Sequence, residues 1–164
     1  MISIIIPVFN EEQHLPKLLK NLEERSAGYI SEIIVVDGGS LDGTAEVARS
    51  SDNVVYVNSE KGRAVQMNNG AKAAAGNVLY FLHADSLPPE DFDRLILQQV
   101  EKGNKAGCFQ MRFDKDHWWL NLMSWLTKVN HISCRGGDQS LFVERKLFEK
   151  IGGFDETYKV YEDN

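Results

Sequence analysis

The hydrophobic residues of this chain occur first in short uninterrupted runs, and each run ends in a polar cluster. Three such runs lie at 4–8, 33–36 and 79–82, and acidic, amide or hydroxyl side chains follow each of them at once. A strand without polar alternation is buried on both faces, which is typical of a parallel sheet covered by helices. In such sheets ligands bind beyond the carboxyl ends of the strands, so we expect the three clusters to converge on one pocket.

Between these runs the apolar residues follow a helical spacing. Leucines at i, i+3, i+4 and i+7 predict a helix from about Glu11 to Arg25. The other expected elements are helices at 44–49 and 64–74 and strands at 32–36, 54–57 and 78–82. Alternating strands and helices are typical of βαβ units. The pattern predicts an α/β fold with a Rossmann-like, mostly parallel sheet and helices on both faces.

The pattern changes after residue 87, where two prolines precede a helix containing 92–100 and a half-exposed strand at 107–113. A further helix at 117–132 carries three tryptophans on a broad apolar face. Its polar face is not basic, which favours packing in the core over a role at an acceptor site or a membrane surface. Self-association or peripheral membrane docking through the tryptophans is the lesser alternative.

Composition narrows the class of protein. A length of 164 residues suits one domain over 1–164, and a net charge of -6 with a pI near 5.2 argues against a nucleic-acid partner. The only cysteines, Cys108 and Cys134, lack a metal-binding spacing and fit a reducing compartment. Because the chain also begins directly with a strand pattern and has no signal-peptide or membrane-spanning run, we expect a cytoplasmic protein.

Two loops could carry chemistry at the strand ends. Asp37 opens a Gly-Gly-Ser-Leu-Asp-Gly-Thr loop at 38–44 that could approach a nucleotide closely, although a tight turn with helix caps explains it equally well. Lys61 and Arg63 lie at the start of an expected helix, where the helix dipole does not favour positive charge. A bound anion such as a diphosphate would explain why two cations stand there. A solvated turn is the competing explanation.

His83 and Asp85 are two residues apart at the end of the strand expected at 78–82. Their side chains would point to the same side of that strand, so they could bind one divalent cation together. Carboxylate and diphosphate oxygens suit Mg²⁺ or Mn²⁺, and an imidazole ligand favours Mn²⁺. The alternative is a buried, hydrogen-bonded His83 beside a capping Asp85. Further acidic loops follow at 136–139 and 161–164, and a carboxylate pair at a chain end is usually just solvated.

Taken together, these segments resemble the family-two, inverting glycosyltransferases of the GT-A fold. The matching pieces, in order, are Ile-Pro-Val-Phe-Asn-Glu-Glu at 6–12, Val-Val-Asp-Gly-Gly-Ser-Leu-Asp-Gly-Thr at 35–44, Lys-Gly-Arg-Ala at 61–64, Asn-Asn-Gly-Ala-Lys-Ala-Ala-Ala-Gly at 68–76, Tyr-Phe-Leu-His-Ala-Asp at 80–85, Gly-Gly-Phe-Asp-Glu at 152–156 and Glu-Asp at 162–163. The Lys-Gly-Arg-Ala and His-Ala-Asp variants, with Gly-Asp-Gln at 137–139, are similar to a bacterial subgroup of small, soluble members.

The resemblance implies a nucleotide-binding half at about 1–87 and an acceptor half at about 88–164. By that resemblance Asp85 would bind the metal that bridges the donor diphosphate, and Asp163 would take the proton from the acceptor hydroxyl. The spacing of His83 and Asp85 along the expected strand adds His83 as a second candidate metal ligand. The nucleotide would contact Pro7, Phe9, Glu11, Asp37, Arg63, His83 and Ala84. The donor and acceptor sugars would contact Gly136, Gly137, Asp138 and Glu162. Metal and base together would support in-line transfer with inversion.

The chain departs from the family pattern in three places. Gly38 stands where relatives often have a second acid, and His83 stands where they have the first acid of Asp-x-Asp. Relatives also continue past the Glu-Asp pair through a helix with acceptor contacts, which leaves open that the 164 residues are a fragment. We expect a nucleoside-diphosphate-sugar donor, UDP-linked rather than GDP-linked, and an unknown acceptor. The alternatives are a non-catalytic nucleotide-sugar-binding module and, less favoured, a nucleotidyltransferase, which usually has a glycine-rich basic loop after its first strand.

Overall fold

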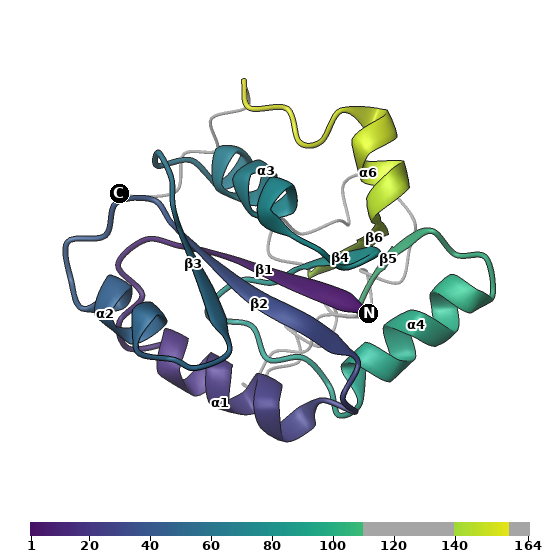
Figure 1. Ribbon diagram of the computed structural model, residues 1–164, viewed down its shortest axis with the longest axis horizontal. Coiled ribbons are helices and arrows are strands. Elements are labelled where there is room, and N and C mark those ends of the chain that lie inside the picture. Colours follow the sequence, from purple (N-terminus) through teal and green to yellow (C-terminus); the bar gives the residue numbers. More distant parts are fainter. Residues whose placement is uncertain (110–139, 158–164) are drawn as a thin grey trace, which may run out of the picture.

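A six-stranded sheet runs through the computed structural model, which describes residues 1–109 and 140–157. The strands are β1 (Ile2–Val8), β2 (Ile30–Asp37), β3 (Val54–Asn58), β4 (Val78–Phe81), β5 (Ala106–Cys108) and β6 (Leu141–Glu144). The helices are α1 (Leu15–Arg25), α2 (Thr44–Arg49), α3 (Arg63–Ala73), α4 (Phe92–Glu101) and α6 (Arg145–Ile151). Across the sheet the strands follow the order β3-β2-β1-β4-β6-β5 (Figure 1).

Strand β1 lies inside the parallel part of the sheet. It pairs in parallel with β2 and with β4, so that Ile4 stands opposite both Ile33 and Tyr80, and β2 pairs in parallel with β3. The apolar runs at 4–6, 33–36 and 78–82 are buried, as expected for strands covered on both faces. The predicted α/β class with a mostly parallel sheet is therefore confirmed.

Helices cover both faces of this sheet, as Figure 1 shows with α1, α2 and α4 on one side and α3 and α6 on the other. One core contains alternate residues of β1, such as Ile4 and Ile6, packed with leucines of α1 and with Phe92 of α4. The opposite core contains Ile5 packed with residues of α3 and with Phe148 of α6. The alternation of β1 side chains thus supplies both cores.

Polar side chains join the elements at the amino-terminal edge of the sheet. The buried Ser3 hydroxyl donates to Glu32 Oε1 at 2.6 Å and accepts the N–H of Gly76 at 2.8 Å. Glu32 Oε1 also accepts the N–H of Ala75 at 2.6 Å. These bonds fix the end of α3 against β1 and β2 at the edge opposite the polar loops.

Several predicted boundaries are wrong in ways that have a local cause. Helix α1 begins at Leu15 and not at Glu11, because Asn10 has a left-handed backbone with φ of 56° and the next residues bond to the loop after β2. Strand β4 ends at Phe81, one residue earlier than expected. The predicted helix at 117–132, and the part of the expected strand at 107–113 beyond Phe109, lie outside the described residues.

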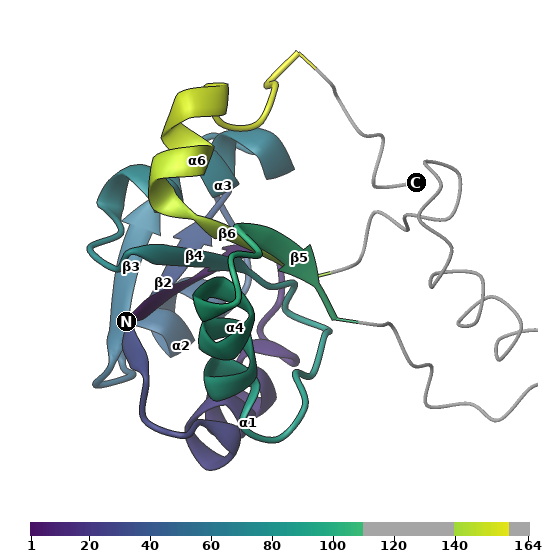
Figure 2. The same cartoon turned by 90° about the vertical axis from the view of Figure 1, so that its right-hand side faces the viewer.

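Strand β6 and helix α6 were not predicted from the sequence. Strand β6 is antiparallel to β4 and to β5, and it lies between them (Figure 2). A long connection separates β5 from β6, so the spacing gives no sign that they are neighbours. Strand β6 contains three apolar residues and one glutamate, and α6 begins at the next residue, so no turn signal separates the two elements.

Candidate functional site

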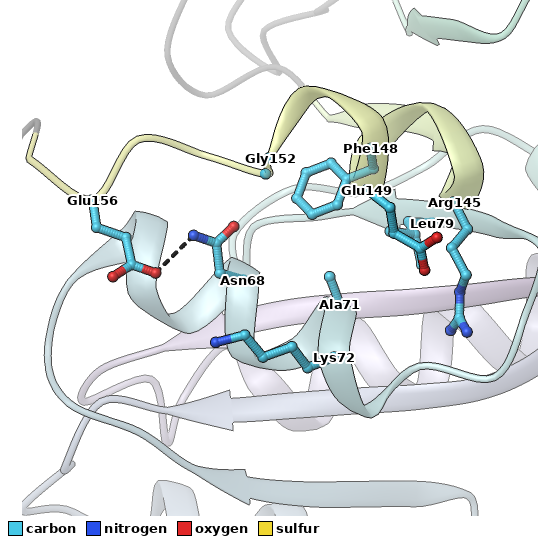
Figure 3. A pocket seen from close by; sticks show the side chains of 10 residues that line it. Asn68, Ala71, Lys72, Leu79, Arg145, Phe148, Glu149, Gly152 and Glu156 are labelled. Atoms are coloured by element: carbon cyan, nitrogen blue, oxygen red, sulfur yellow. Dashed lines mark hydrogen bonds between the residues drawn. The ribbon is translucent and has the colours of Figure 1, made fainter.

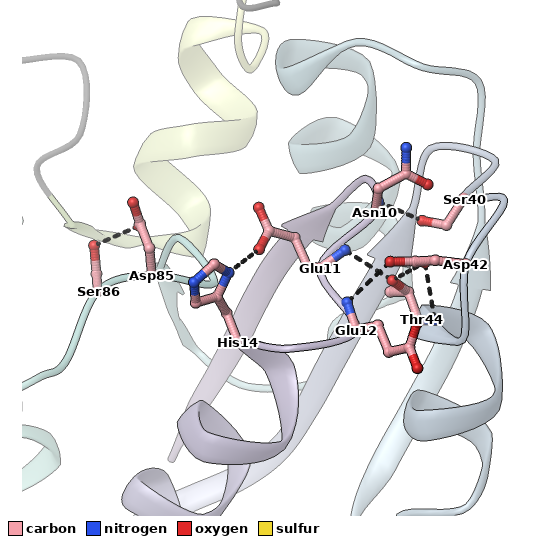
Figure 4. A network of polar contacts seen from close by, with 9 residues as sticks. All are labelled: Asn10, Glu11, Glu12, His14, Ser40, Asp42, Thr44, Asp85 and Ser86. Atoms are coloured by element: carbon pink, nitrogen blue, oxygen red, sulfur yellow. Dashed lines mark hydrogen bonds and ion pairs between the residues drawn. The ribbon is translucent and has the colours of Figure 1, made fainter.

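The loops after β1 and β2 are joined at the carboxyl edge of the sheet. Asn10 donates its N–H to Ser40 Oγ at 2.9 Å, and the Asn10 side-chain oxygen accepts the N–H of Leu41 at 2.9 Å. Glu11 donates its N–H to Thr44 Oγ1 at 2.8 Å (Figure 4). The polar clusters that follow the first two apolar runs therefore form one continuous surface.

Asp42 fixes this junction from the β2 side. Its carboxylate accepts the N–H and the hydroxyl of Thr44 and the N–H of Glu12. Partial burial raises the pKa of the Asp42 carboxyl, but these hydrogen bonds outweigh it and hold the pKa below its usual value. Asp42 is therefore an ionised cap that shapes the loop.

Asp37, at the end of β2, faces the protein interior and is 2% exposed. One carboxylate oxygen accepts the N–H of Ser40 at 2.8 Å and its hydroxyl at 2.6 Å, and the other accepts the hydroxyl of Tyr56 at 2.9 Å. Burial, and then the hydrogen bond to Asp37 and its charge, raise the pKa of Tyr56. Asp37 thus organises the loop, a task that its place in the motif did not reveal.

The basic turn before α3 lies at the same edge. The Lys61 ammonium is 3.8 Å from the centre of the Phe9 ring, a cation–π contact between this turn and the end of β1. Arg63 is the first residue of α3 and is half-buried, and Pro7 lies within β1 opposite Val36. The turn therefore lies beside the end of β1.

The loop after β4 contributes the third cluster, and Figure 4 shows Asp85 at the same end of the sheet as Glu11 and His14. Ala84 and Asp85 lie in a turn that the N–H of Ser86 closes onto the carbonyl of His83 at 3.1 Å. The expected alternation of His83 and Asp85 along a strand is therefore wrong, because β4 has already ended. Asp85 is exposed, whereas His83 is half-buried and Ala84 is buried.

Glu11 has a side-chain partner that the sequence analysis did not identify. His14 Nδ1 lies 2.7 Å from Glu11 Oε2, three residues away along the chain, and this contact is an ion pair when the imidazole is protonated. Within residues 1–109 and 140–157, no three histidine, cysteine, aspartate or glutamate side chains gather closely enough to hold a metal ion. A metal bound at Asp85 would therefore need ligands from elsewhere, such as diphosphate oxygens.

Asn68 is a second residue whose role the sequence analysis missed, although it lies in one of the quoted motifs. Its side chain donates to the Phe154 carbonyl at 2.9 Å and accepts the Phe154 N–H at 2.9 Å, and it also donates to Glu156 Oε1 at 2.8 Å (Figure 3). Asn68 therefore fixes the segment after α6 onto α3. A buried polar residue in the Asn-Asn-Gly motif is the signal that could have indicated this contact.

A pocket of about 390 Å³ lies between α3 and α6, away from the loops described above (Figure 3). Its apolar lining includes Ala71, Leu79 and Phe148, and its polar lining includes Lys72 and Arg145. The remaining site candidates, Asp163, Glu162, Gly136, Gly137 and Asp138, lie outside the described residues.

The strand order, the antiparallel β6 and the loop cluster at the carboxyl edge define an α/β protein of the GT-A type. The sequence matches the model of glycosyl transferase family 2 over residues 3–157. The chain belongs to glycosyltransferase family 2.

Among curated relatives, the undecaprenyl-phosphate 4-deoxy-4-formamido-L-arabinose transferase of Aeromonas hydrophila subsp. hydrophila is 31% identical over an alignment of 136 residues. The match covers 76% of this chain and 41% of that protein. The enzyme with the same name from Pseudomonas paraeruginosa is 35% identical over 120 residues, covering 67% of this chain and 35% of its own length. The chain therefore spans less than half the length of these relatives.

Solved structures show the same fold at lower identity. S. aureus TarS 1-349 superposes with a TM-score of 0.77 at 18% identity, covering 98% of this chain and 52% of its own. The mannosyltransferase PcManGT from Pyrobaculum calidifontis, in complex with GDP-Man and Mn²⁺, has a TM-score of 0.72 at 23% identity, covering 94% of this chain and 47% of its own. Within the part of our chain that the structure describes, no helix is long and apolar enough to cross a membrane.

Proposed function

We propose that this chain binds a nucleoside-diphosphate sugar at the carboxyl edge of its sheet and transfers the sugar, with inversion, to an acceptor. The observation that carries the proposal is the meeting of the loops after β1 and β2 with the basic turn, through the Asn10–Ser40 bond and the Lys61–Phe9 contact. Asp85 lies at the same end of the sheet (Figure 4). An aromatic ring and cations suit a base and a diphosphate. A UDP-linked donor is the first choice, because TarS structures contain UDP and UDP-GlcNAc.

Asp85 fits the role of a metal ligand. It is an exposed carboxylate after a central strand, and within residues 1–109 and 140–157 its Oδ1 accepts only a long hydrogen bond of 3.4 Å from Ser86. Magnesium and manganese prefer such oxygen ligands and bind readily through one carboxylate with phosphate oxygens. When bound, the cation would neutralise charge that develops on the leaving diphosphate.

For the acceptor half we propose the roles implied by the family. For an acceptor hydroxyl, Asp163 takes the proton as general base, while Glu162, Gly136, Gly137 and Asp138 line the sugar sites. A phosphate acceptor attacks through an oxygen that is already ionised at neutral pH and does not need this proton transfer. The relatives named undecaprenyl-phosphate transferases support a polyprenyl phosphate as the first acceptor to test. Such an acceptor would bring the protein to a membrane surface as a peripheral protein.

Calorimetric titration of UDP and GDP, each with and without Mn²⁺, tests the donor site. We expect UDP to bind in the presence of Mn²⁺, and Asp85→Ala to abolish that increment. The matched control is Asp52→Ala, because Asp52 is also exposed but precedes β3 at the opposite edge of the sheet. If UDP and GDP both fail to bind under every condition, the proposal is wrong.

The products distinguish the remaining functions. A transferase releases UDP when a donor and undecaprenyl phosphate are supplied together, and a non-catalytic module binds the donor without releasing UDP. Release of pyrophosphate would instead identify a nucleotidyltransferase.

A further inference from the structure

We infer that Gln66 is the positioning residue that holds the nucleotide-binding loops in register with one another. Its side chain is 4% exposed and lies on α3, under the carboxyl edge of the sheet. The inference rests on the proposed function, because it concerns the loops that would hold the nucleotide. No motif used above assigns a role to this glutamine.

The amide nitrogen of Gln66 joins the ends of two strands. It donates one hydrogen bond to the carbonyl of Val8 and one to the carbonyl of Val36, each at 2.8 Å. Val8 is the last residue of β1, and Val36 is the last but one residue of β2. The chain continues from these points into the Phe9 loop and the Asp37 loop.

The amide oxygen of Gln66 contacts the basic turn before α3. It accepts the N–H of Gly62 at 3.3 Å, while the backbone N–H of Gln66 donates to the Gly62 carbonyl at 2.8 Å. Gly62 has φ of 150°, precedes Arg63 and follows Lys61, so these bonds fix the turn that carries both cations. One side chain therefore touches the ends of β1 and β2 and the basic turn before α3.

Gly38, which follows β2, packs closely against the Gln66 amide. A Cβ atom at Gly38 would lie 3.1 Å from the Gln66 amide atoms, which is tighter than ordinary packing. Gly38 also donates its N–H to the Val8 carbonyl at 3.0 Å, so this carbonyl accepts from both residues. The glycine that replaces the second acid of the family pattern thus leaves room for the glutamine.

If Gln66 had a purely structural role, its loss would lower the stability of the fold but would not change the affinity for UDP. A variant of a buried polar residue at the opposite edge of the sheet provides the comparison for this structural effect. Ser3 is also buried and polar, and it joins β1, β2 and the end of α3 through Glu32 and Gly76. Losing either side chain leaves buried groups unpaired and destabilises the same elements. Only Gln66, however, lies beneath the nucleotide loops.

We would measure UDP affinity in Mn²⁺ by calorimetry at 10 °C, with thermal melts to show that each protein is folded. Gln66→Met, which keeps the length of the side chain but no hydrogen bond, should raise the Kd for UDP at least tenfold. Ser3→Ala should lower the melting temperature but leave the Kd within twofold of wild type. Gln66→Glu keeps the shape and the acceptor, but a carboxyl group can donate at most one of the two bonds, and only when it is protonated, so this variant should also bind UDP more weakly than wild type.

Gly38→Ala is a milder second variant, because its Cβ displaces the Gln66 amide by a few tenths of an ångström without removing it. We expect a smaller loss of affinity in a well-folded protein. Wild-type affinity in folded Gln66→Met or in Gln66→Glu would overturn the inference while leaving the proposed function intact. Absence of nucleotide binding by the wild type would overturn the proposed function, and the inference with it.

Discussion

Removing the Tyr56 hydroxyl should destabilise the loop that Asp37 organises. Tyr56→Phe deletes the 2.9 Å bond to Asp37 and leaves one oxygen of a carboxylate that is 2% exposed without that donor. A hydrogen bond to a charged group contributes about 1.5–3 kcal/mol. Because the Tyr56 side chain is only half-buried and water can partly replace the donor, we expect about 1.5 kcal/mol.

Thermal or urea unfolding followed by circular dichroism measures this loss. In a chain of this size, about 1.5 kcal/mol corresponds to a fall in melting temperature of about 3–6 °C. Tyr29→Phe is the control, because Tyr29 is 40% exposed and should change stability by less than about 0.5 kcal/mol.

The pH dependence gives a second, independent reading of the same bond. The pKa of Tyr56 is raised in the folded protein, so its contribution is complete below the unfolded pKa of about 10 and decreases as the pH rises above that value. The difference in stability between wild type and Tyr56→Phe should therefore shrink above pH 10. Equal stability of the two proteins at pH 7 would refute the role of Tyr56 as a partner of Asp37.

Two further predictions concern the scaffold around the site. Gly152 and Gly153 both have left-handed backbones, but a Cβ atom at Gly153 would also lie 2.7 Å from Asn68 Oδ1, whereas one at Gly152 meets nothing within 4 Å. Gly152→Ala should therefore cost about 1–2 kcal/mol from the backbone alone, and Gly153→Ala about 1–3 kcal/mol more from the clash; equal losses in urea unfolding would contradict the contact. Burial raises the pKa of Asp93, but hydrogen bonds from Ser26 Oγ and three backbone N–H groups outweigh burial and lower that pKa. The Asp93 carboxylate therefore stabilises the fold above the unfolded pKa of about 3.9, and this stabilisation is lost as the pH falls further. The melting temperatures of wild type and Asp93→Asn should converge in acid, and a constant gap down to pH 2 would show that the carboxylate is not responsible.

The parallel half of the fold could be predicted because local pattern and tertiary environment agree there. The runs at 4–8 and 33–36 are buried on both faces, so their hydrophobicity directly indicates their place in the sheet. Strand β6 could not be placed in the same way, since it pairs with β4 across more than 60 residues of sequence and is only four residues long. Its neighbour in the sheet is decided by packing that no local pattern records.

The residues that build the site were harder to find than the loops that carry them. Helix α3 buries the polar residues Gln66 and Asn68 as well as Gly70. Its apolar residues Met67 and Ala71 pack in the core beside them. Buried amides satisfy distant backbone groups, and those partners become visible only when the strand ends are placed beside the helix. Periodicity therefore located the helix and its apolar packing residues, but it did not indicate the buried amides that reach the strand ends.

Acidic residues in similar sequence settings have different tasks at this edge. Asp37 and Asp42 both lie in the loop after β2, and both accept hydrogen bonds from serine or threonine hydroxyls and N–H groups, which stabilise their charge within the protein. Asp85 follows a neighbouring strand but is exposed. Since a cation binds most readily to a carboxylate whose oxygens are not already committed, Asp85 is better suited than Asp37 or Asp42 to meet a metal–diphosphate group. The two acids after β2 instead shape the loop beside the proposed ligand site.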